Sequence, residues 1–293
     1  MIAQKRLIRI KNLQIMKFNL NQTNNSNFLK NLKVKFQIYI SLLVLQIFKI
    51  SILKNKYGLN LIGPYKTFKE AKENSVGYES PIILDKINEA FIKTLEGKSI
   101  YERDGSNFSI KPKKLYIRNI LKRYLRRDST ILDFGGSLGS NYINNKDLFT
   151  KKNKYKIVEQ INFVKQGNLL KKKYDIPIQF YSDINEIKSK VDILILSSVL
   201  HYLEDTKFLF KFINRINPEI IIIDRTPFNF KKKNNWWIQY EKSYYKIPIS
   251  YPIKVINIFL ILNNLNNYSL TKTWINNFDA KFPPHMGILL KKI

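Results

Sequence analysis

Ile131-Leu-Asp-Phe-Gly-Gly-Ser-Leu-Gly-Ser140 lies near the middle of the chain and joins an apolar run, an acid and three glycines. The apolar run is typical of a buried strand, and the glycines indicate a sharp turn before a helix. Glycines also let backbone N–H groups approach a ligand, and a helix N-terminus carries partial positive charge. The segment therefore predicts a loop that binds a nucleoside cofactor, with an ordinary strand-to-helix turn as the alternative.

The glycine spacing distinguishes two kinds of cofactor loop. The dinucleotide pattern G-x-G-x-x-G, aligned from Gly135, would lack two of its three glycines in this chain. An acid followed by glycines, as in Asp133, Gly135 and Gly139, is instead typical of loops that bind S-adenosylmethionine (SAM). Ser137 replaces the middle glycine, and a serine with positive φ costs roughly 1–2 kcal/mol unless Gly136 takes up the turn.

From Thr130 onward, apolar segments alternate with helical patterns. This alternation predicts a mostly parallel sheet with helices on both faces. Two later apolar segments have no long helix between them, and we expect them to form a closing hairpin with an antiparallel edge strand. The seven expected strands are 131–134, 155–158, 178–181, 191–196, 220–223, 268–274 and 286–290.

Three regions surround this sheet in the predicted domain organisation. Residues 57–129 are expected to form a helical cap, with one amphipathic helix from Pro81 toward Gly97 and another over 113–127. Residues 130–293 form the cofactor-binding domain. Within it, residues 228–252 are rich in aromatic residues and are read as an insertion on the acceptor side, or as a small core of their own.

Residues 1–56 are predicted to be a basic arm. No Asp or Glu precedes Glu70, whereas 13 Lys and Arg do. The uncharged run 36–48 is shorter than the roughly 20 residues that span a bilayer. We expect peripheral contact with an anionic membrane on its inner, cytoplasmic side, and the alternatives are a helix packed on the domain or a disordered leader.

Composition narrows the chemistry. The chain has no cysteine and two histidines, so we expect no metal site. The formal net charge of +29 comes mostly from Lys, in a chain equally rich in Asn and Ile, as an AT-rich coding bias would produce. Nucleic acid is therefore not the expected partner. Two other functions stay open as alternatives to an enzyme with a small acceptor: a nucleic-acid methyltransferase and a non-catalytic membrane-surface protein.

Residues at the ends of the predicted parallel strands form the candidate site, because ligands of such sheets bind beyond the carboxyl ends of strands. Glu159 follows the second strand at the distance from the glycines where an acid holds ribose hydroxyls. Asp183 follows the third strand and is either an adenine ligand or a turn-forming residue. Ser197, at the end of the fourth strand, is expected to face the cofactor.

The acceptor side is predicted from the last two strand ends. His201 is the one imidazole expected beside the pocket and suits a general base, although it could simply cap or pack. Asp224 is a second candidate base, and Arg225 could hold an anionic acceptor, unless the two are locked together. Aromatic and amide side chains suited to an acceptor follow, namely Tyr202, Trp237 and Gln239.

Several of these motifs, in this order, resemble a bacterial family of SAM-dependent methyltransferases over roughly residues 60–293. The resemblance implies a Rossmann-like class I methyltransferase fold, SAM as cofactor and methylation, at oxygen, of a small-molecule or glycan acceptor in surface-polysaccharide biosynthesis. Ser137 and His201 depart from the family, which usually has glycine and often has glutamine there. The motifs are Gly77-Tyr78, Glu102-Arg-Asp-Gly105, 131–140, Val158-Glu159, 196–203, Asp224-Arg-Thr-Pro227, Gln239 and Tyr251-Pro252.

Overall fold

The computed structural model describes residues 60–77, 81–229, 236–241, 249–276 and 285–293. The predicted basic arm and its membrane contact lie outside the described residues. Within the described ranges, no helix is long and apolar enough to cross a bilayer.

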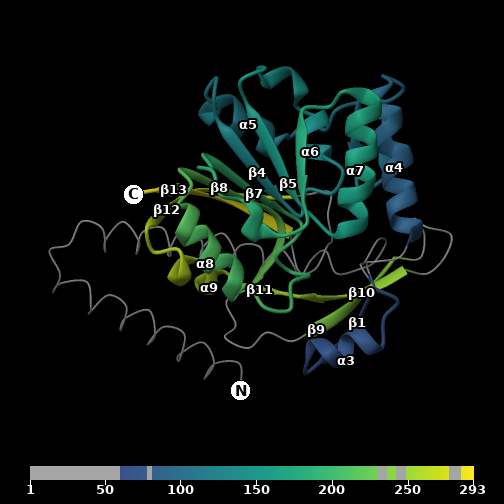
Figure 1. Cartoon of the computed structure of the whole chain (residues 1–293). Helices are drawn as coiled ribbons and strands as arrows, with labels where there is room; N and C mark the ends of the chain where they lie inside the picture. Colours follow the sequence, from purple (N-terminus) through teal and green to yellow (C-terminus); the bar gives the residue numbers. More distant parts are fainter. Residues whose placement is uncertain (1–59, 78–80, 230–235, 242–248, 277–284) are drawn as a thin grey trace, which may run out of the picture. The chain divides into compact units, whose positions relative to one another are not determined.

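The main sheet confirms the predicted strand pattern (Figure 1). Its central strands are parallel, and the last hairpin is antiparallel, with β13 pairing against β8 and β12 forming the edge. A short strand, β11 (Ile256–Asn257), pairs with β8 beside this path. In spatial order the seven strands are β12 (Tyr268–Ile275), β13 (His285–Lys292), β8 (Ile220–Asn229), β7 (Ile193–Ser197), β4 (Thr130–Phe134), β5 (Lys154–Val158) and β6 (Ile178–Tyr181).

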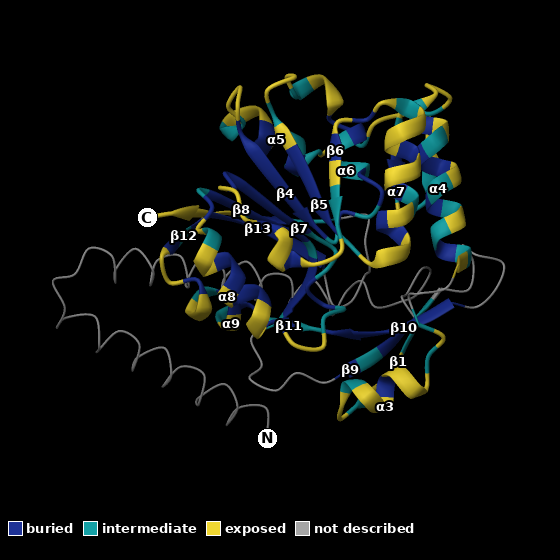
Figure 2. Ribbon diagram, viewed as in Figure 1, coloured by how far each residue is buried: buried dark blue, intermediate teal, exposed yellow. Residues whose placement is uncertain are grey.

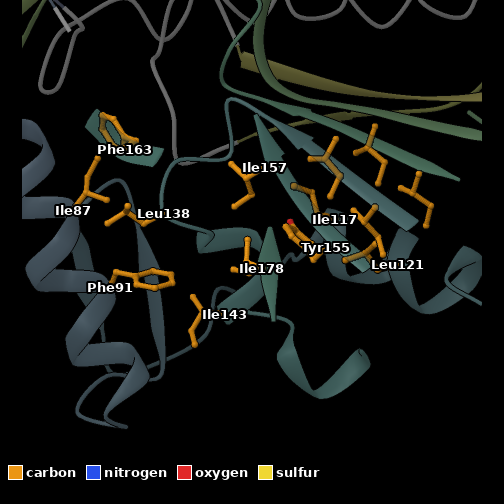
Figure 3. Close-up of a cluster of buried hydrophobic side chains, with 14 of the residues drawn as sticks. Ile87, Phe91, Ile117, Leu121, Leu138, Ile143, Tyr155, Ile157, Phe163 and Ile178 are labelled. Atoms are coloured by element: carbon orange, nitrogen blue, oxygen red, sulfur yellow. The ribbon is translucent and has the colours of Figure 1, made fainter. Parts of the chain in front are cut away.

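Helices cover both faces of this sheet (Figure 1). The strands between them are dark blue in Figure 2, since they are buried on both sides. One face packs in a large core against three helices, and Figure 3 shows part of this core. Those helices are α4 (Pro81–Leu95), α5 (Tyr116–Tyr124) and α7 (Ile161–Tyr174), and on the opposite face lie α8 (Lys207–Ile216) and α9 (Ile258–Asn264).

The two helices predicted before the sheet are present, with one shorter than expected. Helix α4 runs over the predicted span and is followed by Gly97 at φ +74°, where a glycine ends a helix without strain. Helix α5 begins after Leu115 and ends before Leu125, whose backbone is extended. Residues 113–115 and 125–127 of the predicted span therefore lie outside the helix.

Strands as well as helices occupy the region predicted to be a helical cap. The first strand, β1 (Asn60–Tyr65), pairs with β9 (Trp236–Glu241), and β9 pairs with β10 (Ile249–Lys254) in a separate three-stranded sheet. Helix α3 (Phe68–Glu73) packs on this sheet, and Figure 1 shows the two together. Strands β2 (Tyr101–Arg103) and β3 (Ser106–Phe108) form a small hairpin after α4.

Candidate functional site

The loop after β4 has the backbone shape that its glycines predict. Gly135 and Gly139 have φ of +73° and +107°, where side chains are rarely tolerated. A Cβ on Gly135 would lie 2.6 Å from Val199 Cγ2, and one on Gly139 would lie 2.7 Å from Ile178 Cδ1. Ser137 also has positive φ, +54°, so the turn falls on the serine and Gly136 does not relieve it.

Glu159 lies beside this loop at the end of the neighbouring strand β5. Its Oε2 accepts a hydrogen bond from the Ser137 N–H at 3.1 Å, and its Oε1 accepts one from the Gln160 N–H at 2.9 Å. The Gly135 N–H donates to the Val158 carbonyl at 2.9 Å. Burial raises the pKa of Glu159 against these two N–H donors. The structure therefore brings the predicted glycines and the predicted acid together.

Asp133 is buried beneath the loop rather than on its surface. A Cβ on Gly136 would lie 2.6 Å from Asp133 Cγ. Asp133 Oδ2 accepts hydrogen bonds from Tyr155 Oη at 2.8 Å and Asn141 Nδ2 at 3.1 Å, while Oδ1 has no partner among the described residues. Burial raises the pKa of this carboxyl to about 6. Asp133 thus supports the loop from below and keeps one unsatisfied oxygen there.

Asp183 occupies a turn at the end of β6. Its Oδ1 accepts from the Asn185 N–H at 2.8 Å, and its own N–H donates to Glu186 Oε1 at 2.9 Å. These two bonds cap the short helix η3 (Ile184–Glu186). The side chain is exposed, and the contacts that it makes are those of a turn-forming residue.

The end of β8 places Asp224 next to Ser197 on β7, in direct register. Asp224 Oδ1 accepts from Trp274 Nε1 at 2.6 Å and from Asn276 Nδ2 at 3.1 Å, so this carboxylate is held by the edge strand β12. Ser197 is half-buried. Asp224 is thus bonded to Trp274, whereas the Arg225 guanidinium is bonded to Asp104.

Arg225 pairs with Asp104 in the turn of the β2–β3 hairpin. Its Nη1 donates to Asp104 Oδ1 at 3.1 Å, and its Nη2 donates to Oδ2. The Arg225 side chain is largely buried, whereas that of Asp104 is mostly exposed. A guanidinium held in this two-point arrangement already has an anion, so an acceptor would have to share it.

His201 is fully buried in the loop between β7 and α8. Its ring centre lies 4.0 Å from that of Tyr202 and 5.6 Å from that of His285. Neither of its ring nitrogens has a hydrogen-bond partner within the described part of the chain. Burial, with the nearby charges of His285 and Arg225, holds its pKa well below the usual value, so the ring is neutral at pH 7.

His285 was missed by the sequence analysis, which expected one imidazole at the site. It begins β13, which runs antiparallel to β8 and pairs His285 with Pro227. The start of an antiparallel strand lies at the same edge as the carboxyl ends of its parallel neighbours. The predicted closing hairpin therefore carried the signal for this second histidine.

Side chains of the aromatic segment lie on both faces of β9. Gln239 is buried and its Nε2 donates to Tyr251 Oη at 3.1 Å, while the Tyr251 ring meets the Tyr202 ring edge-on at 5.2 Å. Trp237 is half-buried and packs against the main core. Trp236 points to the other face, where it packs with Phe68 of α3 at 4.8 Å. Tyr251 thus links the predicted acceptor residues Tyr202 and Gln239. The small core predicted as the alternative is also present, on the face of β9 that carries Trp236.

The strand order and the glycine loop after β4 define an α/β, Rossmann-like fold. No protein-family model matches the sequence, and a search of curated proteins gives no significant match. Among the described residues, no cluster of three or more His, Cys, Asp or Glu could hold a metal ion.

Several solved methyltransferases have similar folds. A SAM-dependent methyltransferase from Aquifex aeolicus is 14% identical, with 73% of this chain and 99% of that chain covered and a TM-score of 0.46. A SAM-dependent methyltransferase from Methanosarcina mazei is 11% identical, with 61% and 99% covered and a TM-score of 0.47. The 1,6-didemethyltoxoflavin-N1-methyltransferase of Burkholderia thailandensis, solved with S-adenosylhomocysteine and 1,6-didemethyltoxoflavin, is 10% identical, with 71% and 88% covered and a TM-score of 0.45.

Proposed function

We propose that this chain is a SAM-dependent methyltransferase that acts on a small-molecule or glycan acceptor. One observation carries the proposal: the glycine loop after β4 is hydrogen-bonded, through the Ser137 N–H, to Glu159 at the end of β5. The sheet order changes direction between β4 and β7, and open α/β sheets bind ligands at that point. The loop therefore stands where a nucleoside cofactor would bind.

The residues at this point fit SAM. Gly135 and Gly139 keep side chains away from the loop, so its backbone can approach a ligand. We assign Glu159 to accept hydrogen bonds from the two ribose hydroxyls, and Asp183, which follows β6, to contact the adenine. Ser137 Oγ and Asp133 Oδ1 are buried beside the loop with no partner among the described residues. When bound, SAM would supply a methyl group activated by a positively charged sulfur.

The residues at the ends of β7 and β8 suit an oxygen acceptor. Methyl transfer to a hydroxyl forms a C–O bond, breaks the S–C bond and releases the hydroxyl proton. Neither ring nitrogen of His201 has a hydrogen-bond partner among the described residues, so we assign one of them to accept that proton. We assign Asp224 to positioning this edge and Arg225 to holding the β2–β3 hairpin, with Tyr202, Trp237 and Gln239 contacting the acceptor. The sequence resemblance supports a sugar acceptor in bacterial surface-polysaccharide biosynthesis.

The test is calorimetric titration of the full chain with SAM and with S-adenosylhomocysteine. We expect both to bind, and Glu159→Ala to weaken each by at least about tenfold, since a charged hydrogen-bond acceptor is lost. Glu73→Ala on the exposed face of α3 is the control and should bind as the unaltered protein does. Absence of binding by the unaltered chain would refute the proposal. Equal affinity in both variants would remove Glu159 from the cofactor site.

A further inference from the structure

The β2–β3 hairpin is held on α4 by contacts that fix its turn. Gly105 has φ +77°, and a Cβ there would lie 3.2 Å from the Ile87 backbone nitrogen. Asn107 Nδ2 donates to the Ala90 carbonyl at 2.8 Å and to Thr94 Oγ1 at 3.1 Å. The hairpin is therefore fixed on α4.

The same hairpin joins the helix of the glycine loop to the end of β8. The Glu102 N–H donates to Asn144 Oδ1 at 3.0 Å, and Asn144 Nδ2 donates to the Glu102 carbonyl at 2.6 Å. Asn144 ends α6 (Ser140–Ile143), which begins directly after Gly139. On the other side, the hairpin turn pairs with Arg225 through Asp104. Glu102 thus lies between the loop after β4 and the carboxyl end of β8.

The side chain of Glu102 has an unsatisfied oxygen at this place. Glu102 is 0% exposed, and its Oε1 accepts from the Gly105 N–H at 2.9 Å. Its Oε2 is buried without a hydrogen-bond partner within the described residues. Burial raises the pKa of this carboxyl to about 7, although hydrogen bonds from the Ser140 side chain and the Gly105 N–H lower it. A buried carboxylate oxygen that lacks a donor is costly, and a cationic ligand at that oxygen would remove the cost.

We propose that Glu102 binds the α-ammonium group of SAM. This inference rests on the proposed function. If the ribose is held at Glu159 after β5 and the methyl group faces His201 after β7, the amino-acid end of the cofactor would lie over the loop, on the side of α6. Asp133 lies beneath the loop, whereas Glu102 lies on the hairpin bonded to Asn144 at the end of α6, and we assign its Oε2 to accept a bond from the ammonium. The β2–β3 hairpin then closes the amino-acid end of the cofactor site.

The experiment compares three ligands by calorimetry on the full chain: SAM, S-adenosylhomocysteine, and a SAM analogue in which hydrogen replaces the α-amino group. We expect Glu102→Gln to weaken SAM and S-adenosylhomocysteine equally, each by about tenfold or more, as for loss of a charged hydrogen bond. Affinity for the deamino analogue should not change. Glu96→Gln is the matched control, since this exposed carboxylate lies near the end of α4 and is paired with Lys98. It should bind all three ligands normally.

Each contrary outcome has its own meaning. Equal loss for all three ligands in Glu102→Gln would show a structural acid and overturn the assignment. Loss for SAM alone would place the carboxylate near the sulfonium instead and also overturn it. Should Glu102→Gln not fold, the unaltered chain decides, because a deamino analogue that binds as tightly as SAM would overturn the inference. A chain that binds no SAM at all would refute the proposed function, whereas binding that is unaffected in Glu102→Gln would refute only the role of Glu102.

Discussion

Ser137 holds a backbone conformation that suits glycine. Its φ is +54°, its N–H donates to Glu159, and its Oγ is buried without a partner among the described residues. We predict that Ser137→Gly raises the free energy of unfolding by up to about 1 kcal/mol, because relief of the left-handed strain outweighs the greater freedom of an unfolded glycine. Urea unfolding would measure this gain. SAM affinity should be kept or improved, since the N–H contact does not need the side chain.

Asn217→Gly is the control for this prediction. Asn217 follows α8 with φ +47°, and asparagine tolerates this conformation better than serine does. We therefore expect a smaller change in unfolding free energy than at Ser137. A larger gain at Asn217 than at Ser137 would show that the serine is not strained in the loop.

Asp133 should make stability depend on pH. Its pKa is raised to about 6, whereas an unfolded Asp titrates near pH 4. Between about pH 4 and pH 6 the unfolded chain loses this proton and the folded chain keeps it, so rising pH favours unfolding. Asp133→Asn removes this effect. Relative to the unaltered protein, we predict that the variant gains about 2–3 kcal/mol of unfolding free energy from pH 4 to pH 7.

Thermal or urea unfolding across this pH range measures the difference, and Asp147→Asn supplies a control of opposite sign. The hydrogen bonds from Arg118 lower the pKa of Asp147 to about 2, so its contribution to stability is present above pH 4 and is lost as the pH falls toward 2. Asp147→Asn should therefore be less stable than the unaltered protein at pH 5, with the gap closing on acidification. A difference for Asp133→Asn that stays constant with pH would contradict the raised pKa.

Which residues gather at the site could be predicted better than what each one contacts. Glycine spacing and strand ends located Glu159 beside the loop, because both features are local in sequence. The partners of Asp224 and Arg225 were not predictable in this way: Trp274 comes from a strand 50 residues later, and Asp104 from a hairpin about 120 residues earlier. Neither contact leaves a periodic pattern in the sequence.

The two faces of β9 lead to a prediction at the scale of one element. Trp236 is 7% exposed in the small core with Phe68, and its ring lies 5.0 Å from Lys254 Nζ. We predict that Trp236→Ala lowers the free energy of unfolding by about 3 kcal/mol, because a large buried side chain leaves a cavity. SAM affinity should change little, since this core lies apart from the glycine loop. Urea unfolding and calorimetry measure the two quantities.

Trp237→Ala provides the matched comparison on the adjacent residue, which faces the other way along the strand. Trp237 is half-buried, so its removal should cost less stability. If Trp237 contacts the acceptor, the variant should raise KM for the acceptor, once one is identified by release of S-adenosylhomocysteine. A large loss of stability with unchanged KM would make Trp237 a core residue instead.

Elements of the main sheet were predictable because each strand and helix there alternates locally with the next. The final hairpin could be recognised because no long helix separates its two strands. The small sheet was not predictable, since Asn60 pairs with Tyr240 and each strand alone is short. Strand β1 lies between the predicted basic arm and the first predicted helix, where the sequence shows no strand pattern.

At the scale of the whole molecule, β1 joins the start of the described residues to a sheet formed much later in the chain. It pairs with one edge of β9, and β10 pairs with the other edge. Beyond this sheet, the Gly77 N–H donates to the Ser250 carbonyl at 2.8 Å, and the Lys254 N–H donates to the His201 carbonyl at 2.9 Å. The small sheet therefore connects the segment before α4 with the loop that carries His201. We therefore expect removal of β1 to destabilise both the segment before α4 and the loop that carries His201.

This connection gives a prediction for two truncated chains, one that begins at residue 57 and one that begins at residue 67. Only the second lacks β1, so it leaves the hydrogen-bonding edge of β9 uncovered and exposes the apolar side chain of Ile238. We predict that the chain beginning at 67 has a lower Tm than the chain beginning at 57 and associates at high concentration, while both bind SAM. Acceptor turnover should fall in the shorter chain, because the hydrogen bond from β10 to the His201 loop depends on an intact small sheet. Equal Tm and equal turnover in the two chains would show that β1 neither stabilises the small sheet nor supports the His201 loop.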